Sequence, residues 1–292
     1  MAHKSGFVNI VGNPNVGKST FMNALLGEKL SIITSKAQTT RHRIFGIYND
    51  DDYQIVFSDT PGIIKPSYAL QANMMQFAQS TLKDADVLLF MTTCKEKTLK
   101  DEAFFERIAK LNVPVLVLIN KIDVSEQGEL EEAVQHWKTQ LPKAEIFPLS
   151  ALENFNTQEV LDRVKALLEE GPAYFDKDAI TDKPERFFIS EIIREKVLLN
   201  YHKEIPYSVE VEIESFKEDE KIVRIAAILY VARDSQKGII IGHKGRDIKR
   251  LGTQARIDIE KFLNKKVFLE TFVKVNKNWR ENENQLKRFG YQ

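Results

Sequence analysis

The chain has 292 residues, of which 43% are hydrophobic and 29% are charged, and its formal net charge is zero. Such a length favours two domains over a single core. The apolar runs are too short for a membrane-spanning helix or a signal peptide, and the single cysteine, Cys94, excludes an internal disulfide framework. We therefore expect a two-domain protein of the cytoplasm.

Residues 6–170 alternate short apolar runs with helical patterns. The runs predict strands at 7–11, 44–48, 54–58, 87–92, 115–120 and 146–149, and the patterns predict helices at 17–26, 73–83, 101–110, 129–140 and 158–169. This alternation favours an α/β fold, in which helices cover both faces of a mostly parallel sheet. The turn-rich segment after residue 48 predicts a hairpin and hence one antiparallel edge strand.

Residues 171–186, GPAYFDKDAITDKPER, break this alternation with prolines, a glycine and several charges. We place the first domain at 1–172, a linker at 173–185 and the second domain at 186–292. The second domain has the pattern of an α+β fold. Its expected elements are a helix at 187–200, strands at 208–214 and 221–233, a helical stretch at 235–263 interrupted by GHKG, a strand at 267–275 and a short helix at 281–289.

The sequence GNPNVGKST at residues 12–20 lies between a predicted strand and a predicted helix. It fits G-x-x-x-x-G-K-[ST], in which glycines let backbone N–H groups converge on phosphate oxygens. Lys18 would reach the outer phosphates, and the Ser19 hydroxyl would bind Mg²⁺. A plain strand–turn–helix loop is the alternative. The expected phosphate-binding residues are Gly12, Asn13, Pro14, Asn15, Val16, Gly17, Lys18, Ser19 and Thr20.

Two further stretches predict that the base is guanine. NKID follows the strand at 115–120, and the Asp123 carboxylate can accept hydrogen bonds from guanine N1–H and the exocyclic amine. Adenine would leave that carboxylate unpaired, at a cost of a few kcal/mol. SAL, at 150–152, ends the last strand, where the N–H of Ala151 can donate to guanine O6. The expected base-binding residues are Asn120, Lys121, Asp123, Ser150, Ala151 and Leu152.

DTPG, at residues 59–62, ends the strand at 54–58. Asp59 can hold Mg²⁺ through water, and Gly62 can present its N–H to the γ-phosphate. Thr39 or Thr40, in the polar loop SKAQTTRHR, would complete the Mg²⁺ site; we favour Thr40. The γ-phosphate would order this loop and the one after DTPG. The expected nucleotide contacts are Asp59, Thr60, Pro61 and Gly62, and the expected metal ligands are Ser19, Thr40 and Asp59.

These four motifs resemble those of translation-factor-class GTPases. Ras-like enzymes place a water-orienting glutamine directly after Asp-x-x-Gly, whereas this chain has Ile63 there. We therefore expect slow hydrolysis and identify no catalytic base. In related GTPases an asparagine at the position of Asn15 helps to hold K⁺, so the resemblance implies K⁺ stimulation, with a turn residue as the alternative. The residues expected to act in catalysis are Asn15, Lys18, Thr40 and Gly62.

IIIGHKGRDIKRLG, at residues 239–252, places G-x-x-G between two helical segments. A GXXG loop that clamps four nucleotides is typical of the KH module, and residues 233–292 carry 15 Lys and Arg against 7 Asp and Glu, a net charge of +8. We expect RNA contacts from Ile241, Gly242, His243, Lys244, Gly245, Arg246, Lys249 and Arg250. A base groove would be formed by Ile239, Ile240, Ile241, Ile248 and Leu251. Phe187, Phe188 and Trp279 fit core positions better than stacking platforms, and the histidines show no zinc-binding spacing.

The whole chain resembles the Era family of bacterial ribosome-assembly GTPases. The stretches that carry the resemblance are KAQTTRHRI (36–44), SEIIREK (190–196), PYSVEVEIE (206–214) and IIIGHKG (239–245). It implies a P-loop GTPase domain, a type II KH domain, GTP hydrolysis to GDP with Mg²⁺, and binding near the 3′ end of 16S rRNA during assembly of the 30S ribosomal subunit. It also implies a monomer with loose peripheral attachment to the inner membrane.

Two other functions stay open on the sequence. The second domain of a GTPase switch can bind protein, in which case its basic end is only a solvated surface. Alternatively, the chain is an RNA-binding module whose nucleotide site binds GTP without hydrolysing it. Ile63 supports this interpretation, whereas the intact motif residues Lys18, Ser19, Asp59 and Gly62 oppose it.

Overall fold

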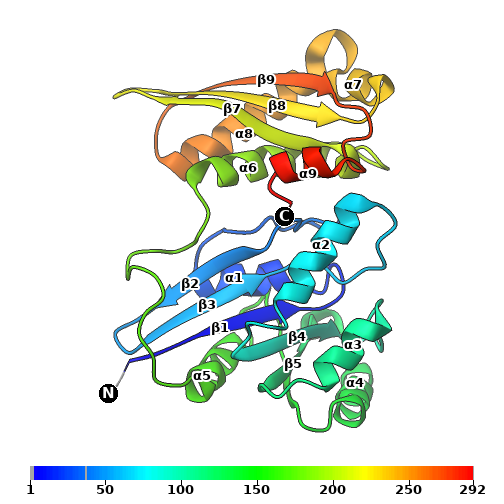
Figure 1. Cartoon of the computed structure of the whole chain (residues 1–292), viewed down its shortest axis with the longest axis vertical. Coiled ribbons are helices and arrows are strands. Elements are labelled where there is room, and N and C mark those ends of the chain that lie inside the picture. The colour runs from blue at the N-terminus through cyan, green and yellow to red at the C-terminus, as the bar shows by residue number, and fades with distance from the viewer. Residues whose placement is uncertain (1–2, 37, 292) are drawn as a thin grey trace. The chain divides into compact units, whose positions relative to one another are not determined.

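The computed structural model describes residues 3–36 and 38–291 (Figure 1). The chain divides into two compact units: the first comprises the residues up to 67 together with 71–182, and the second comprises 68–70 together with the residues from 183 onward. Among the described residues, no helix is both long and apolar enough to cross a membrane.

The first unit is built on a six-stranded sheet in the order β2-β3-β1-β4-β5-β6. β2 runs antiparallel to β3, and the other neighbouring strands are parallel, as predicted. The strands are β1 (Lys4–Val11), β2 (Ile44–Asn49), β3 (Tyr53–Asp59), β4 (Val87–Thr93), β5 (Val115–Asn120) and β6 (Glu145–Pro148).

Helices cover both faces of this sheet, which is why its central strands are continuous apolar runs. On one face α2, α3 and α4 share a core in which Phe90, Phe104 and Trp137 are buried. On the other, α1 packs against β2, β3 and α5. The helices are α1 (Lys18–Leu26), α2 (Ala69–Ser80), α3 (Glu102–Ala109), α4 (Gln127–Gln140) and α5 (Thr157–Leu167).

The parallel register brings the predicted motifs to one edge of the sheet. Ile10 pairs with Asp59, and Thr93 pairs with Asn120. The segments that follow β1, β3, β5 and β6 therefore leave the sheet at its carboxyl edge, where α/β proteins bind ligands.

The segment expected to be a linker, 173–185, lies mostly along the first unit. Ile47 N donates to Ile180 O at 2.9 Å, and Gly46 forms a bridge with Thr181. The Gln54 side chain accepts from the N–H of Tyr174 and of Phe175 and donates to Phe175 O. The segment thus covers the exposed edge of β2, as edge strands in native proteins are commonly covered.

The second unit has a three-stranded sheet in the order β7-β8-β9, with β7 antiparallel and β9 parallel to β8. Residues of α6, α7 and α8 form a core against one face, in the α+β layout predicted for a KH domain. The elements are α6 (Glu185–Asn200), β7 (Glu210–Glu218), β8 (Val223–Val231), α7 (Asp234–Ile241), α8 (Arg246–Leu263), β9 (Val267–Val275) and α9 (Glu283–Arg288).

Candidate functional site

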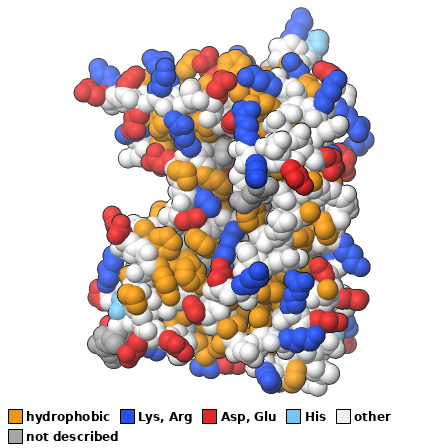
Figure 2. Space-filling view, viewed as in Figure 1, with side chains coloured by type: hydrophobic (Ala, Val, Ile, Leu, Met, Phe, Trp, Pro, Cys, Tyr) orange, Lys and Arg blue, Asp and Glu red, His pale blue; other side chains and the backbone are white. Residues whose placement is uncertain are grey.

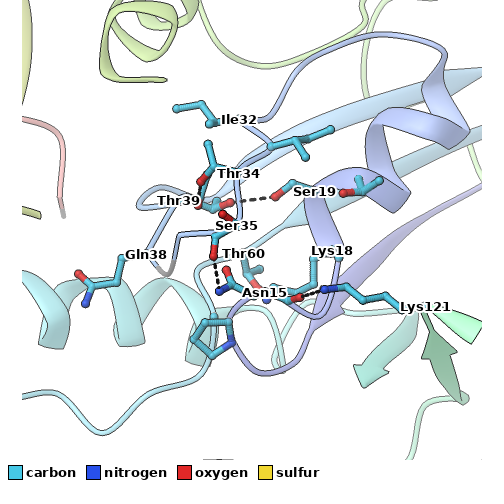
Figure 3. Close-up of a pocket in the computed structure, with 16 residues that line it drawn as sticks. Asn15, Lys18, Ser19, Ile32, Thr34, Ser35, Gln38, Thr39, Thr60 and Lys121 are labelled. Atoms are coloured by element: carbon cyan, nitrogen blue, oxygen red, sulfur yellow. Dashed lines mark hydrogen bonds between the residues drawn. The ribbon is translucent and has the colours of Figure 1, made fainter. Parts of the chain in front are cut away.

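A cavity of about 440 Å³ opens beside the loop at residues 12–20 (Figure 3). That loop and the residues 32–35 and 38–40 form most of its wall. The predicted residues that line it are Pro14, Asn15, Gly17, Lys18, Ser19, Thr20, Thr40, Thr60, Gly62 and Lys121. Ser35, Gln38 and Thr39, which belong to the polar loop SKAQTTRHR, also line it. Ile32, Ile33 and Thr34 line it too, although no motif in the sequence pointed to them.

Gly17 lets the phosphate loop pack closely against Asn120 of the NKID segment. Its φ is 104°, and a Cβ here would lie 2.2 Å from Asn120 Nδ2, so the position requires glycine. Asn120 Nδ2 donates to Val16 O at 2.8 Å, and Asn120 Oδ1 accepts from Ala151 N at 2.9 Å. Asn120 therefore connects the loop expected to bind phosphate with the segment expected to bind the base. In this structure the Ala151 N–H, which we expected to donate to guanine O6, donates to Asn120 instead.

Lys18 is a buried cation at the cavity. Its Nζ donates to Gly12 O at 3.2 Å and to Asn13 O at 2.9 Å. Burial lowers the pKa of Lys18 to about 8, although the negative charges of Asp59 and Glu96 oppose this change. A bound phosphate would bring a full negative charge to a cation that here contacts two neutral carbonyl oxygens.

The oxygens of Ser19, Thr40 and Asp59 lie together. Asp59 Oδ2 accepts from Ser19 Oγ at 2.6 Å and from Thr40 Oγ1 at 3.1 Å. Burial raises the pKa of Asp59, while the hydrogen bond from Ser19 and the charge of Lys18 lower it. Asp59 Oδ1 is buried and has no hydrogen-bond partner among the described residues. A spare carboxylate oxygen beside two hydroxyls fits a hard cation such as Mg²⁺.

The same geometry separates Thr40 from Thr39. Thr39 Oγ1 donates to Lys36 O at 2.6 Å and lies 3.0 Å from Thr34 Oγ1, so it is engaged within its own loop. Thr40, by contrast, reaches Ser19 and Asp59. The arrangement favours Thr40 as the metal ligand.

The segment after Asp59 contacts the phosphate loop through its backbone. Ile63, which stands where Ras-like enzymes carry glutamine, is fully buried in the core, and its N–H donates to Gly12 O at 3.0 Å. Gly62 lies so close to the loop that a Cβ would come within 2.7 Å of Pro14 Cα. The side chain of Ile63 therefore lies outside the cavity, and slow hydrolysis stays a prediction.

Asn15 joins the phosphate loop to the segment 32–40. Its Nδ2 donates to Ser35 O at 2.9 Å, and its own carbonyl accepts from Lys121 Nζ at 2.7 Å (Figure 3). The Asn15 amide nitrogen thus meets the Ser35 carbonyl oxygen at the cavity wall. The Ser35 carbonyl oxygen and the Asn15 amide oxygen are atoms of the kinds that commonly bind hard cations.

Other predicted residues lie outside this cavity. Gly12, Asn13, Val16, Asp59, Pro61, Asn120, Asp123 and Ser150–Leu152 do not line it. Asp123 is exposed in the short 3₁₀ helix Ile122–Val124, and Leu152 is 72% exposed. The 440 Å³ cavity therefore corresponds to the phosphate end of the expected site.

Glu96 was missed by the sequence analysis. Asn13 Nδ2 donates to Glu96 Oε2 at 3.1 Å and to Thr98 O at 2.9 Å, which fixes the segment after β4 behind the phosphate loop. Burial raises the pKa of Glu96, and the Asn13 hydrogen bond opposes this rise. Residues 94–97, CKEK, read as an ordinary polar loop, so nothing local pointed to this contact.

In the second unit the GHKG segment forms a sharp turn between α7 and α8. Gly242, Lys244 and Gly245 all have positive φ, at 72°, 50° and 77°. The polar side chains around the turn are exposed: His243, Lys244, Arg246, Lys249 and Arg250. Figure 2 shows Lys and Arg side chains gathered over the end of this unit that carries α7.

The expected base groove needs correction. Ile240 and Leu251 are fully buried in the core of the second unit, so they cannot contact bases. Of the apolar residues named for the groove, Ile239 is the most open, at 51% exposed. Trp279 is also buried, and its Nε1 donates to Ser208 O at 3.0 Å, as expected of a core residue.

Known proteins match the chain over both units. A family described as 50S ribosome-binding GTPase matches residues 7–121, and a KH domain family matches residues 204–280. The chain is 40% identical to an Era protein crystallised with MgGDPNP and nucleotides 1506–1542 of 16S ribosomal RNA, with 99% of each chain covered and a TM-score of 0.94. The chain belongs to the Era family. An Era variant from Aquifex aeolicus, crystallised with GDP·AlF₄⁻, matches at the same 40% identity, 99% coverage and TM-score of 0.94.

Membership of the Era family makes Asp123 a direct test of base recognition. Asp123→Asn should weaken GTP binding by about 100-fold, because the amide keeps only one of the two acceptor oxygens and turns its NH₂ donor toward a guanine donor. The same variant should gain affinity for xanthosine triphosphate, whose C2 oxygen can accept from the new amide. Isothermal titration with both nucleotides measures the change. Asp162→Asn, an exposed acid-to-amide change in α5, is the control, and a variant that still prefers GTP would contradict the assignment.

The lowered pKa of Lys18 predicts how an Era-family chain responds to pH. Bound phosphate favours the charged ammonium, so above pH 8 binding must take up a proton, and GDP affinity should fall about tenfold between pH 7 and 9. Lys18→Arg is the control, because its guanidinium stays charged and its binding should lack this fall. A titration series with GDP checks the slope; equal pH profiles for both proteins would show that Lys18 is not the titrating group.

Proposed function

We propose that this chain is a GTP-hydrolysing molecular switch that binds 16S rRNA near its 3′ end through the GHKG turn and acts in assembly of the 30S ribosomal subunit. The observation that carries the proposal is the full-length likeness to an Era protein crystallised with both MgGDPNP and 16S rRNA nucleotides 1506–1542. The description of the matching GTPase family names the 50S subunit, but it covers only residues 7–121. The full-length relative is more specific, and its RNA belongs to the small subunit.

In the proposed site the loop at 12–20 wraps the phosphates and Lys18 neutralises their charge. Ser19, Thr40 and Asp59 would hold Mg²⁺, which shields the phosphate oxygens and stabilises charge that develops on them. Asp123, Asn120 and the segment 150–152 would read guanine. Because Thr40 belongs to the segment 32–40, metal binding with γ-phosphate would order that segment, and loss of γ-phosphate would release it.

Hydrolysis in this site would depend on a cation at Asn15. The contact between Asn15 and Ser35 O places an amide and a carbonyl beside the phosphate loop. K⁺ bound there would add positive charge that stabilises the transition state, in a site where the buried Ile63 side chain cannot assist hydrolysis. Replacing K⁺ with Na⁺ should therefore slow GTP turnover severalfold, and Asn15→Ala should remove the difference. Equal rates in both salts for the parent protein would exclude Asn15 from catalysis.

A measurement of RNA binding distinguishes the proposed function from the alternative in which the second unit of a GTPase switch binds protein. The test compares the affinity of the full chain for an RNA with the sequence of 16S nucleotides 1506–1542 and for a scrambled RNA of equal length. We expect at least about tenfold tighter binding of the matching RNA, as base readout adds to the phosphate contacts. Equal affinities would reject the assigned RNA target.

The proposal also includes a monomer in the cytoplasm with loose attachment to the inner membrane. Analytical ultracentrifugation tests the monomer, and a dimer at micromolar concentration would reject it. Cell fractionation tests the location, since a salt-washable fraction in the membrane pellet is the expected result and complete absence from it would reject attachment.

A further inference from the structure

Asp247 lies directly against the first glycine of the GHKG turn. A Cβ built on Gly242 would come within 2.1 Å of Asp247 Oδ2 and within 2.6 Å of Asp247 Cγ. Gly242 also has a φ of 72°, which favours glycine independently of this contact. The Asp247 side chain thus occupies the space that a side chain at residue 242 would need, and its carboxylate stands next to the main chain expected to receive RNA phosphates.

The same carboxylate faces two of the cations around the turn. Asp247 Oδ1 lies 3.4 Å from Arg250 Nη2 and 3.9 Å from Arg246 Nε. The arginine side chains are 79% and 52% exposed, for Arg246 and Arg250 respectively, whereas that of Asp247 is 23% exposed. Ion pairs this exposed contribute little to folding stability, so we expect the charge of Asp247 to act mainly on a further anion that approaches the arginines.

We propose that Asp247 limits the strength with which the GHKG turn holds RNA phosphates, by competing with them for Arg246 and Arg250 and for the positive N-terminal end of α8. This inference rests on the proposed RNA-binding function and names a residue that sets its affinity. Phosphate contacts position RNA without reading its sequence. A carboxylate that weakens them lowers binding to every RNA equally, and base contacts then supply a larger share of the total affinity.

The sign of the effect separates this role from a structural one. If Asp247 only supports the turn, its replacement loosens the turn and weakens RNA binding. If Asp247 competes with phosphate, its replacement strengthens RNA binding. Asp247→Asn is the suitable change because the amide keeps the shape against Gly242 and removes the charge.

The experiment measures the affinity of the full chain for the 16S-derived RNA and for the scrambled RNA, by fluorescence anisotropy over a range of salt concentrations. At low salt Asp247→Asn should bind both RNAs about fivefold more tightly. The plot of log affinity against log salt should steepen by up to about 0.7 for each guanidinium released to phosphate. Asp247→Glu keeps the charge and should stay closer to the parent affinity.

Two controls locate the effect. Asp219→Asn makes the same change in the β7–β8 turn and should leave RNA binding unchanged. Arg250→Gln should remove most of the gain when it is combined with Asp247→Asn. Unchanged or weaker RNA binding by Asp247→Asn, with an unchanged melting temperature, would overturn the inference. Absence of RNA binding by the parent chain would instead reject the proposed function.

Discussion

Lys18→Ala should weaken GTP binding by about 100- to 1,000-fold. The parent Lys18 is only 6% exposed and is held by two loop carbonyls, so its charge already lies where the outer phosphates would sit. Hydrogen bonds to charged groups contribute about 1.5–3 kcal/mol each, and the alanine variant would lose those to two phosphate groups. Isothermal titration with GTP and Mg²⁺ measures the loss.

Lys143→Ala is the matched control for this loss. Lys143 is exposed beside β6 at the far edge of the sheet from the phosphate loop, so its replacement should leave GTP affinity unchanged. A melting curve of Lys18→Ala without nucleotide shows whether the fold is kept. A folded Lys18→Ala that retains the parent affinity for GTP would contradict the phosphate-binding role of the loop at 12–20.

His243→Asp combined with Lys244→Asp should abolish RNA binding and preserve GTP binding. The two side chains are exposed at the tip of the turn, and the change places two carboxylates where phosphates would bind, one of them in place of the Lys244 cation. The glycines are poorer choices: any side chain at Gly242 would collide with Asp247. Lys244 has a φ of 50°, which aspartate tolerates better than most residues.

The expected loss for this double variant is at least about 100-fold in RNA affinity at low salt, because a cation becomes an anion at a site of close phosphate approach. Lys217→Asp with Lys221→Asp reverses two exposed lysines near the β7–β8 turn, at the other end of the sheet from α7 (Figure 1), and should have a much smaller effect. Equal losses in both double variants would mean that net charge alone, and not the GHKG turn, binds RNA.

The sequence was sufficient for the architecture of both units because the deciding signals are local. Buried parallel strands read as apolar runs such as 87–92, and the turns that follow them carry glycines and charged residues at fixed spacing. The motifs also predicted the cluster of Ser19, Thr40 and Asp59, because parallel strands bring their carboxyl ends to one edge.

Other contacts could not be predicted because their partners are distant in the chain. Residues 173–185 were predicted to be a linker, because the prolines, the glycine and the charges of 171–186 give no sign of the backbone hydrogen bonds that the segment makes with β2. Glu96 has no local signature, and only the fold brings it to Asn13. Ile240 and Leu251 were expected to contact bases beside the turn, but helix geometry directs them into the core. Asp247 was not singled out, because nothing in the sequence marks its contact with Gly242.

The measurement that tests the account most directly is GTP turnover by the purified chain in Mg²⁺ and K⁺, with and without the RNA that corresponds to 16S nucleotides 1506–1542. We expect slow turnover by the chain alone and a changed rate when the matching RNA binds, while the scrambled RNA leaves the rate unaltered. Absence of turnover under every condition, or an unchanged rate although the matching RNA binds, would contradict an RNA-linked GTPase switch.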